Sequence, residues 1–565
     1  MKPELRLRCN STLYHAGAER RAACAIPLNM SDFKRASRWW RSETIYQIYP
    51  RSFSDHSGDG VGDLEGIRAR LPYLRDLGVD ALWLSPIFAS PMKDFGYDIA
   101  DYRAIDPLFG TMADFDRLLA EAHEAGLKLL LDLVPNHSSD QHAWFKASRS
   151  SREDPKRDWY IWKDAAPDGG PPNNWISNFG GPAWAWDEAT GQYYHHAFLA
   201  SQPDLDWRNP EVRAAMFDAM RFWLDKGVDG FRVDVIWHLA KDEHFRDNPP
   251  NPDYTPSQPE IERNLQVHSA DQPEIHRIVA DMRSVMEEYD ERLLIGEIYL
   301  PLERLMDYYG EGGSGVHLPF NFQLIQTDWH AQKVAALVAE YEAAIPEDGW
   351  PNWVLSNHDQ PRIAARTGER QARNAALLLL TLRGTPTLYY GEEIGIGDVE
   401  IPPGRIQDPW AKQEPETSRN RDKARTPMQW SSKPHAGFST TEPWLPLSAD
   451  WQRRNVAAMT GEGSSMLELH RSLLHLRRQH TALSTGDYRQ LSVADDTFTF
   501  ERCDAQARFA VLLNFASEPR EVALHPAYEG GAILFSTDAK RTGAANAPFT
   551  LGPDEGVIIQ GDPPS

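Results

Sequence analysis

Eight short apolar segments, separated by longer segments with helical periodicity, constrain the fold of this chain more than any other feature. Intervening segments such as MADFDRLLAEAHEAG carry apolar residues at i, i+3 and i+4 and end in glycine. Continuous apolar strands joined by helices indicate a parallel sheet covered on both faces. Eight such strands close into a barrel, so the sequence predicts an α/β fold, a (β/α)8 TIM barrel. The eight segments are residues 44–49, 81–86, 127–134, 230–235, 293–299, 315–322, 352–359 and 385–393.

Two interruptions and a change of pattern predict the domain organisation. The barrel is expected at 39–137 and 211–483, and it includes an irregular insertion at 395–455. Residues 138–210 follow the third strand and are rich in Trp, Pro, Gly and Asn, which indicates an inserted subdomain. Helical periodicity is lost after residue 483, and 484–565 predicts a C-terminal antiparallel β-sandwich.

Charge and cysteine content limit the classes of partner. The chain has 565 residues and a net charge of −23, which disfavours nucleic acid and anionic membrane as partners. Its longest apolar runs are too short to span a membrane. Three cysteines, Cys9, Cys24 and Cys503, form no disulfide framework and favour a reducing compartment, so the cytoplasm is expected.

Residues 1–38 are basic and predict a disordered tail, or an upstream misassigned start before Met30.

Polar residues recur at the carboxyl ends of the predicted strands. The third strand runs into DLVPNH, the fourth carries Arg232 and Asp234, the fifth ends at Glu297 and the seventh ends in NHD, residues 357–359. Barrel enzymes build their active sites at this end of the strands. A single residue of this kind, such as Asp234, is explained equally well by a structural role, as a buried ion pair with Arg232. Polar clusters at the ends of four strands together favour an active site.

Among these side chains are the carboxylates of Asp234, Glu297 and Asp359, and together they suggest glycosidic chemistry. The chain has neither His/Cys metal-ligand spacing nor a glycine-rich phosphate loop. Acetal cleavage needs one protonated and one ionised carboxyl group. Arg232 lies two residues from Asp234, on the same side of the strand, and is expected to keep it ionised as the nucleophile. Glu297 has no adjacent cation and is the candidate acid, and Asp359 is expected to bind sugar hydroxyls.

Taken together, the motifs resemble a known family. DLVPNH, GFRVDV, GEIY and SNHD are similar to four sequence regions of the α-amylase superfamily, glycoside hydrolase family 13. QPDLDW, DFGYDIADY and RDKARTPMQW are typical of its α-glucosidase and oligo-1,6-glucosidase branch. The RDNPPNP loop resembles proteobacterial α-glucosidases, including α-glucosyl-transferring enzymes. The resemblance covers roughly residues 40–565.

The resemblance implies a role for each motif residue. Asp234 matches the nucleophile, Glu297 the general acid/base and Asp359 the transition-state stabiliser. Family members retain configuration, so the first two carboxyl groups are expected about 5 Å apart. Asp94 and Arg425 are expected to grip the 4-hydroxyl side of the terminal glucose and to close the pocket. The full set of substrate-binding residues implied is Asp94, Tyr97, His137, Phe179, Phe198, Gln202, Arg232, His358 and Arg425.

The loop DHSGDGVGD, residues 55–63, predicts a cation site. Asp at alternate positions suits Ca²⁺ or Mg²⁺, and a plain Asp/Gly turn is the alternative. The resemblance implies Ca²⁺ in a structural role, and no organic cofactor. Its ligands would be Asp55, Ser57, Asp59, the carbonyl of Val61 and Asp63.

The function implied is that of an exo-acting α-glucosidase that acts on short α-glucosides and also transfers glucosyl units to hydroxyl acceptors. Val235, next to the nucleophile, is typical of α-1,6 enzymes. The longer loop from His238 to Tyr254 resembles α-1,4 enzymes, so maltose-like substrates are favoured. Alternatives are an oligo-1,6-glucosidase, a sucrose- or trehalose-forming transglycosidase and, remotely, a non-catalytic binding subunit. A monomer or homodimer is expected.

Four histidines outside the motifs, His123, His142, His195 and His196, are interpreted as surface or packing residues.

Overall fold

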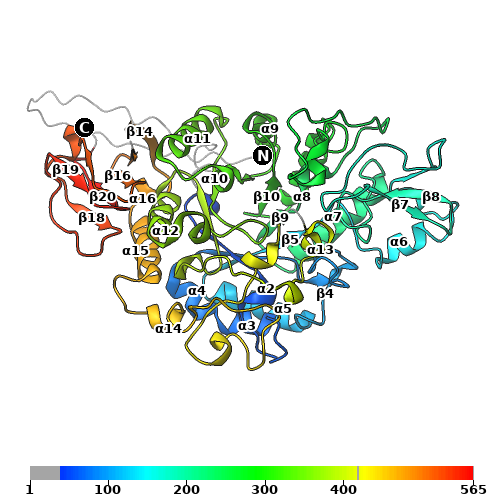
Figure 1. Ribbon diagram of the computed structural model, residues 1–565, viewed down its shortest axis with the longest axis horizontal. Coiled ribbons are helices and arrows are strands. Elements are labelled where there is room, and N and C mark those ends of the chain that lie inside the picture. The colour runs from blue at the N-terminus through cyan, green and yellow to red at the C-terminus, as the bar shows by residue number, and fades with distance from the viewer. Residues whose placement is uncertain (1–37, 416–418, 495, 564–565) are drawn as a thin grey trace, which may run out of the picture. The chain divides into compact units, whose positions relative to one another are not determined.

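Eight parallel strands form a closed barrel at the centre of the chain (Figure 1). The computed structural model describes residues 38–415, 419–494 and 496–563. The predicted tail, 1–38, lies outside the described residues except for Arg38. The strand order around the barrel is β1, β13, β12, β11, β10, β9, β5 and β2, and β2 pairs with β1. The strands are β1 (Ile45–Ile48), β2 (Ala81–Leu84), β5 (Lys128–Leu133), β9 (Gly230–Val233), β10 (Leu293–Ile298), β11 (Leu318–Asn321), β12 (Asn352–Val354) and β13 (Thr385–Tyr389). All eight predicted strands and the barrel are confirmed.

Helices follow the barrel strands as the periodicity predicts. The 13-residue helix after β2 begins with a capping box, in which Thr111 and Asp114 each bond the backbone of the other. Its apolar face, with Phe115 and Leu118, is buried. The main helices are α4 (Leu71–Leu77), α5 (Met112–Glu124), α7 (Pro210–Asp225), α8 (Ile275–Met286), α9 (Leu302–Asp307), α11 (Ala331–Ala344), α12 (Ile363–Thr381) and α15 (Met466–Gln479).

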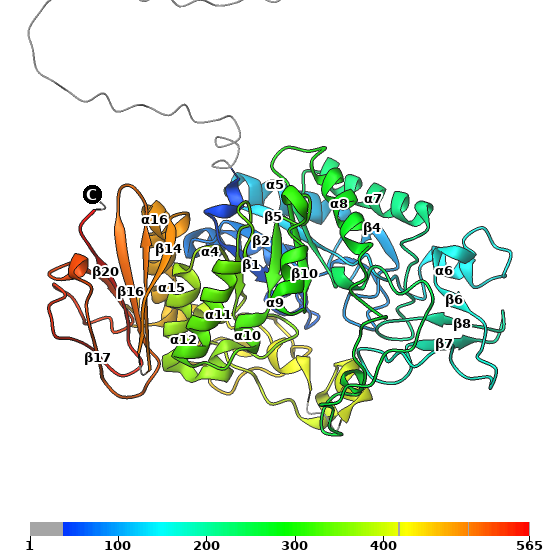
Figure 2. The same cartoon turned by 90° about the horizontal axis from the view of Figure 1, so that it is seen from above.

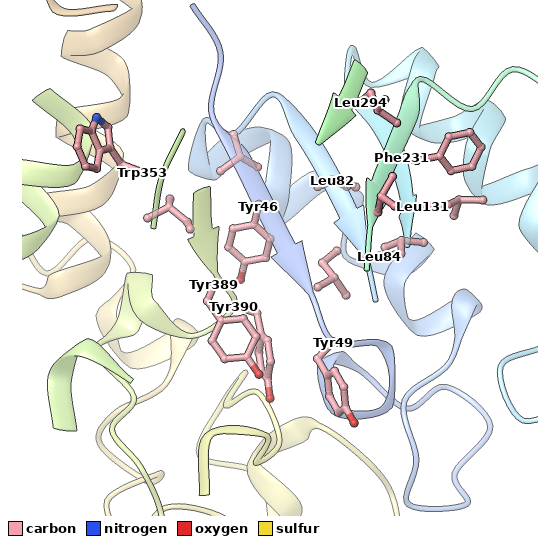
Figure 3. Close-up of a cluster of buried hydrophobic side chains, with 14 of the residues drawn as sticks. Tyr46, Tyr49, Leu82, Leu84, Leu131, Phe231, Leu294, Trp353, Tyr389 and Tyr390 are labelled. Carbon is pink, nitrogen blue, oxygen red and sulfur yellow. The ribbon is translucent and has the colours of Figure 1, made fainter. Parts of the chain in front are cut away.

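Strand alternation divides the barrel residues between two environments. Leu82, Leu131 and Phe231 belong to the large buried cluster that includes the covering helices, part of which Figure 3 shows. The intervening residues, Trp83 and Leu130 among them, belong to a second cluster with opposite strand parity, inside the barrel. By the same parity, the polar residues at the strand ends project into the barrel mouth.

The start of β9 requires glycine. Gly230 has a φ of 156°, and a Cβ there would lie 2.0 Å from the carbonyl oxygen of Leu293 on β10. Only the absence of a side chain lets the two strands approach this closely. The close pairing sets the register of β9 against β10, in which Arg232 lies beside Ile295.

Smaller sheets lie on either side of the barrel (Figure 2). In the insertion after β5, helix α6 (Ala143–Ser148) accompanies a sheet of β6 (Trp162–Lys163), β8 (Gln192–His195) and β7 (Trp184–Asp187). The C-terminal strands form an antiparallel five-stranded sheet and a strand pair, which confirms the predicted all-β region. They are β14 (Asp487–Ala494), β15 (Thr497–Cys503), β16 (Arg508–Asn514), β20 (Gly556–Gln560) and β18 (Ile533–Ser536), with β17 (Arg520–Val522) and β19 (Phe549–Leu551) as the pair. Among the described residues, no helix is long and apolar enough to cross a bilayer.

Candidate active site

A single guanidinium group links three carboxyl groups at the mouth of the barrel. Arg232 Nη1 donates to Asp234 Oδ1 at 2.7 Å and to Asp132 Oδ1 at 2.8 Å. Its Nη2 lies 2.8 Å from Glu297 Oε2. All four residues are buried. The expected contact between Arg232 and Asp234 is present, so the charge pair on β9 is part of a larger cluster.

The expectation that Glu297 has no adjacent cation is wrong. Arg232 pairs in register with Ile295, which lies two residues before Glu297 on the neighbouring strand β10 and on the same side of it. The long side chain of Arg232 covers this offset. Sequence spacing along one strand could not reveal a contact made between two strands.

Burial nevertheless raises the pKa of Glu297 well above its usual range, because the opposing effect of Arg232 is smaller. The carboxylates of Asp234 and Asp359 raise it further. This is the direction that an acid needs in order to stay protonated near neutral pH. Burial likewise raises the pKa of Asp132 to about 7, although Arg232 acts in the opposite direction.

The backbone after Asp234 has a conformation that is unusual for its residue type. Val235 lies in the left-handed region with φ 37° and ψ 47°, which costs a β-branched residue about 1–3 kcal/mol. In this conformation its N–H donates to Glu297 Oε2 at 2.8 Å. The strained residue thus connects the candidate nucleophile to the candidate acid.

A second set of charges surrounds Asp359, which follows β12. Arg425 Nη2 donates to Asp359 Oδ1 at 2.7 Å, and His358 Nε2 lies 3.0 Å from Oδ2. Burial alone would raise the pKa of Asp359, but His358, Arg425 and Arg421 hold it well below its usual range. The two carboxyl groups are therefore shifted in opposite directions, with the pKa of Asp359 lowered and that of Glu297 raised.

Asp94 is paired with Arg421, a residue that the sequence prediction did not include. Arg421 Nη2 donates to Asp94 Oδ1 at 2.7 Å and to Asp408 Oδ1 at 2.8 Å, and Nη1 reaches Asp359 Oδ1 at 3.2 Å. Arg421 and Arg425 both come from the motif RDKARTPMQW, four residues apart. The 3-10 helix Arg421–Ala424, which has Arg425 as its C-cap, is too short for a periodic pattern to indicate which of the two arginines contacts Asp94.

The remaining predicted residues gather beside this ion pair. Gln202 Nε2 lies 3.3 Å from Asp94 Oδ2 and 3.2 Å from His137 Nε2. The Tyr97 hydroxyl donates to Asp132 Oδ2 at 3.0 Å. The Tyr97 ring stacks on His358 with centroids 5.3 Å apart. These contacts connect the loops that follow β2, β5 and β12.

Phe179 and Phe198, from the inserted segment, place aromatic rings beside these polar residues. Their ring centroids are 5.8 Å apart, and Phe198 lies 5.1 Å from the His137 ring. The Arg421 guanidinium lies over Phe179 at 4.9 Å. Trp410 packs against Phe179 at 5.3 Å and was not predicted. The structure therefore connects the predicted substrate-binding residues to one another and to the catalytic carboxyl groups.

A separate buried charge cluster fastens the inserted segment beside the site. Lys241 Nζ lies 2.5 Å from Asp204 Oδ2, and it donates to Asn136 Oδ1 at 2.8 Å and to the His238 carbonyl at 2.6 Å. His195 Nδ1 lies 3.1 Å from the same carboxylate. Every member is buried. His195 was interpreted as a surface or packing residue, and it is a buried partner of an ion pair.

The loop at 55–63 uses its carboxylates as hydrogen-bond acceptors. Asp55 accepts from the backbone N–H groups of Gly58 and Gly60, and Asp63 accepts from those of Ser57 and Gly66. Nowhere in the described ranges are three or more His, Cys, Asp or Glu side chains grouped to hold a metal ion. The loop has the hydrogen bonds of an Asp/Gly turn, and Ca²⁺ at Asp55, Ser57, Asp59, Val61 and Asp63 stays a prediction.

Known proteins share this architecture along most of the chain. A probable alpha-glucosidase of Rhizobium meliloti is 42% identical over 496 residues, 85% of this chain and 90% of that protein. An oligo-1,6-glucosidase of Halalkalibacterium halodurans is 38% identical over 570 residues, 93% of this chain and 99% of that protein.

Solved structures agree with these relatives. The α-glucosyl transfer enzyme XgtA matches with a TM-score of 0.88 and 41% identity, over 93% of this chain and 100% of that one. The trehalulose synthase MutB of Pseudomonas mesoacidophila matches with a TM-score of 0.83 and 35% identity, over 93% of this chain and 99% of that one. The family model of the alpha amylase catalytic domain matches residues 47–486. The chain therefore belongs to the α-amylase family.

Proposed function

We propose that this protein is an exo-acting, retaining α-glucosidase that releases glucose from the non-reducing end of short α-glucosides. The observation that carries the proposal is the Arg232 cluster, in which one cation contacts both Asp234 and Glu297 at the carboxyl ends of the barrel strands. Relatives named alpha-glucosidase and maltase support the substrate class.

In the first step, Glu297 gives its proton to the glycosidic oxygen while an Asp234 oxygen attacks the anomeric carbon. The bond from that carbon to the leaving oxygen breaks, and a bond to Asp234 forms. In the second step, Glu297 takes a proton from water, whose oxygen attacks the anomeric carbon and releases Asp234. A sugar hydroxyl in place of water completes a glucosyl transfer, so hydrolysis and transfer use the same residues.

Exo action is supported by the buried charges around Asp94. Arg421 joins Asp94, Asp408 and Asp359, and these groups come from the loops that follow β2, β12 and β13. Buried charged groups there can bind the hydroxyls of a terminal glucose. They exclude a further sugar unit.

Product analysis tests the proposal. Incubation with maltose, isomaltose and sucrose is followed by chromatography, and NMR records the anomer of glucose released at early times from an aryl α-glucoside, which contains a single glucose. We expect the highest rate of glucose release on maltose, and α-glucose as the first product from the aryl α-glucoside. β-Glucose as the first product from the aryl α-glucoside, or no glucose from any α-glucoside, would refute the proposal.

Preference for α-1,6 linkages is the second candidate, favoured by Val235 and by relatives named oligo-1,6-glucosidase. It predicts faster hydrolysis of isomaltose than of maltose in the same assay. A sucrose isomer among the products would instead support an isomerising transglycosidase, as in the neighbours named trehalulose synthase. A cytoplasmic location and a monomeric or homodimeric state are part of the proposal and rest on sequence alone.

A further inference from the structure

A glutamine lies inside the barrel, where strand alternation would favour an apolar side chain. Gln47 is on β1 between Tyr46 and Ile48, and it is completely buried. It shares strand parity with Ile45, which belongs to the apolar cluster inside the barrel. A buried carboxamide destabilises a protein unless its polar atoms find hydrogen-bond partners. The contacts of Gln47 therefore indicate its role.

Gln47 contacts a histidine of the candidate active site. Its Nε2 lies 2.8 Å from His358 Nδ1, and it donates a longer hydrogen bond, of 3.3 Å, to Ser85 Oγ. Its Oε1 makes no hydrogen bond within the residues that the structure describes. The contact with His358 is thus the closest polar interaction of this buried carboxamide.

Aromatic rings hold the plane of the His358 imidazole. The Tyr97 ring stacks on it with centroids 5.3 Å apart and an interplanar angle of 4°, and the Tyr49 ring stacks on it at 5.8 Å and 18°. The Trp83 ring meets it at 6.3 Å in a T-shaped arrangement. With its plane held, the imidazole forms hydrogen bonds only through its two nitrogens, in directions that the protein sets.

The group that faces Nε2 determines which nitrogen carries the proton. His358 Nε2 lies 3.0 Å from Asp359 Oδ2, and the pKa of Asp359 is held well below its usual range. An ionised carboxylate only accepts hydrogen bonds, so it favours a proton on Nε2. Within the described ranges Nε2 has no aligned hydrogen bond, so this N–H can also donate to a sugar hydroxyl of the substrate.

A second proton on the ring is disfavoured. Burial lowers the pKa of His358 to about 4, although Asp359 opposes this effect, and Arg425 and Arg232 lower it further. A neutral ring with its proton on Nε2 leaves Nδ1 as an acceptor, which matches the N–H of Gln47. With the carboxamide reversed, Oε1 would face Nδ1 and would require either a cationic ring or a bare Nε2 beside the carboxylate.

We propose that Gln47 is a positioning residue, which donates to Nδ1 of His358 and thereby keeps the proton of the neutral ring on Nε2, facing Asp359. The proposal rests on the proposed function and deepens it, because His358 and Asp359 belong to the site that is proposed to act on glycosides. A proton on Nδ1 would instead turn a nitrogen lone pair toward the Asp359 carboxylate. Gln47 acts through His358 and takes no part in the chemical step.

Nuclear magnetic resonance of the full chain with ¹⁵N-labelled histidines tests the assignment, since protonated and bare ring nitrogens resonate at different frequencies. The signals of His358 are identified by their loss in His358→Gln. Near neutral pH we expect a proton on Nε2 and none on Nδ1. A protonated Nδ1 would overturn the proposal, whether or not the enzyme cleaves α-glucosides.

Gln47→Met tests the contribution of the glutamine, because methionine has a similar length but no N–H. We expect the Nδ1 resonance of His358 to move as this nitrogen loses its hydrogen bond. We also expect kcat/KM on an aryl α-glucoside to fall about tenfold. A wild-type kcat/KM in this variant would overturn the positioning role.

Asn352→Leu is the matched control, because Asn352 is also a completely buried carboxamide on a barrel strand. It donates to the Thr385 carbonyl and to Thr387 Oγ1 and not to a histidine. This variant should lose stability but keep the wild-type His358 resonances and kcat/KM. Equal changes in both variants would show that Gln47 acts by packing alone, and the proposal would fail. A wild-type enzyme with its proton on Nε2 that cleaves no α-glucoside would instead refute the proposed function.

Discussion

Removal of the Lys241 ammonium should destabilise the protein strongly, although Lys241 contacts none of the catalytic carboxyl groups. Lys241→Met keeps the length of the side chain and deletes the charge that faces Asp204 at 2.5 Å. Breaking a buried ion pair by removing one partner costs about 3–5 kcal/mol. His195 and the Ala197 N–H still contact the Asp204 carboxylate, at 3.1 and 3.0 Å. We therefore expect a loss near the lower end, about 3 kcal/mol.

The double variant Lys241→Met/Asp204→Asn separates charge from packing. It leaves no buried unpaired carboxylate, so it should be more stable than Lys241→Met alone. Urea unfolding followed by tryptophan fluorescence gives the free energies for a double-mutant cycle. Equal stability of wild type and Lys241→Met, or a double variant less stable than the single one, would refute the reasoning.

The stability loss in Lys241→Met should also depend on pH. Burial would raise the pKa of Asp204, but Lys241 and His195 hold it well below its usual range. In the wild type, burial lowers the pKa of His195. Lys241 adds to this lowering, so its removal should bring the pKa of His195 nearer to its usual value. A histidine whose pKa is lowered on folding destabilises the protein at low pH, and this effect is weaker where the lowering is smaller. The loss should therefore be smaller near about pH 5.5 than near about pH 8.

Four further predictions concern the site and the metal. Asp234→Asn should lower kcat on an aryl α-glucoside by about 10⁴ or more; activity within a hundredfold of wild type would show that another group forms the covalent bond. Activity should fall as pH rises through the raised pKa of Glu297, and Glu297→Gln should lose more activity on maltose than on an aryl glucoside whose leaving group needs no proton; equal losses would contradict the acid role. Arg421→Lys cannot keep its two-sided contact with Asp94 and Asp408 and should raise KM for maltose about tenfold or more, which initial-rate kinetics would check; an unchanged KM would disprove the closed glucose end. If the 55–63 loop binds Ca²⁺, EGTA should lower Tm by a few degrees and metal analysis should find one equivalent; a metal-free protein with unchanged Tm would leave the loop as a plain turn.

Local patterns predicted the barrel because each strand and helix carries its own periodicity. They predicted the site residues because barrel topology brings the strand ends together, so a motif on each strand is enough to place Asp234 and Glu297 near each other. Pairings between distant loops escaped prediction. Nothing along the chain indicates that Lys241 meets Asp204, or that Arg421 rather than Arg425 meets Asp94. Such choices depend on how irregular loops pack, and those loops have no repeating pattern.

Arg232 contacts both Asp234 and Glu297, and this has a consequence for the electrostatics of the reaction. In the proposed first step, Glu297 becomes negative when it gives up its proton, and Asp234 becomes neutral when it bonds to the sugar. Of these two groups, one is negative before the step and the other after it, so the charge that faces Arg232 only changes partner, between contacts of 2.7 and 2.8 Å. The surrounding dipoles therefore need little rearrangement as the reaction proceeds, which is the condition under which a fixed protein environment lowers an activation barrier most.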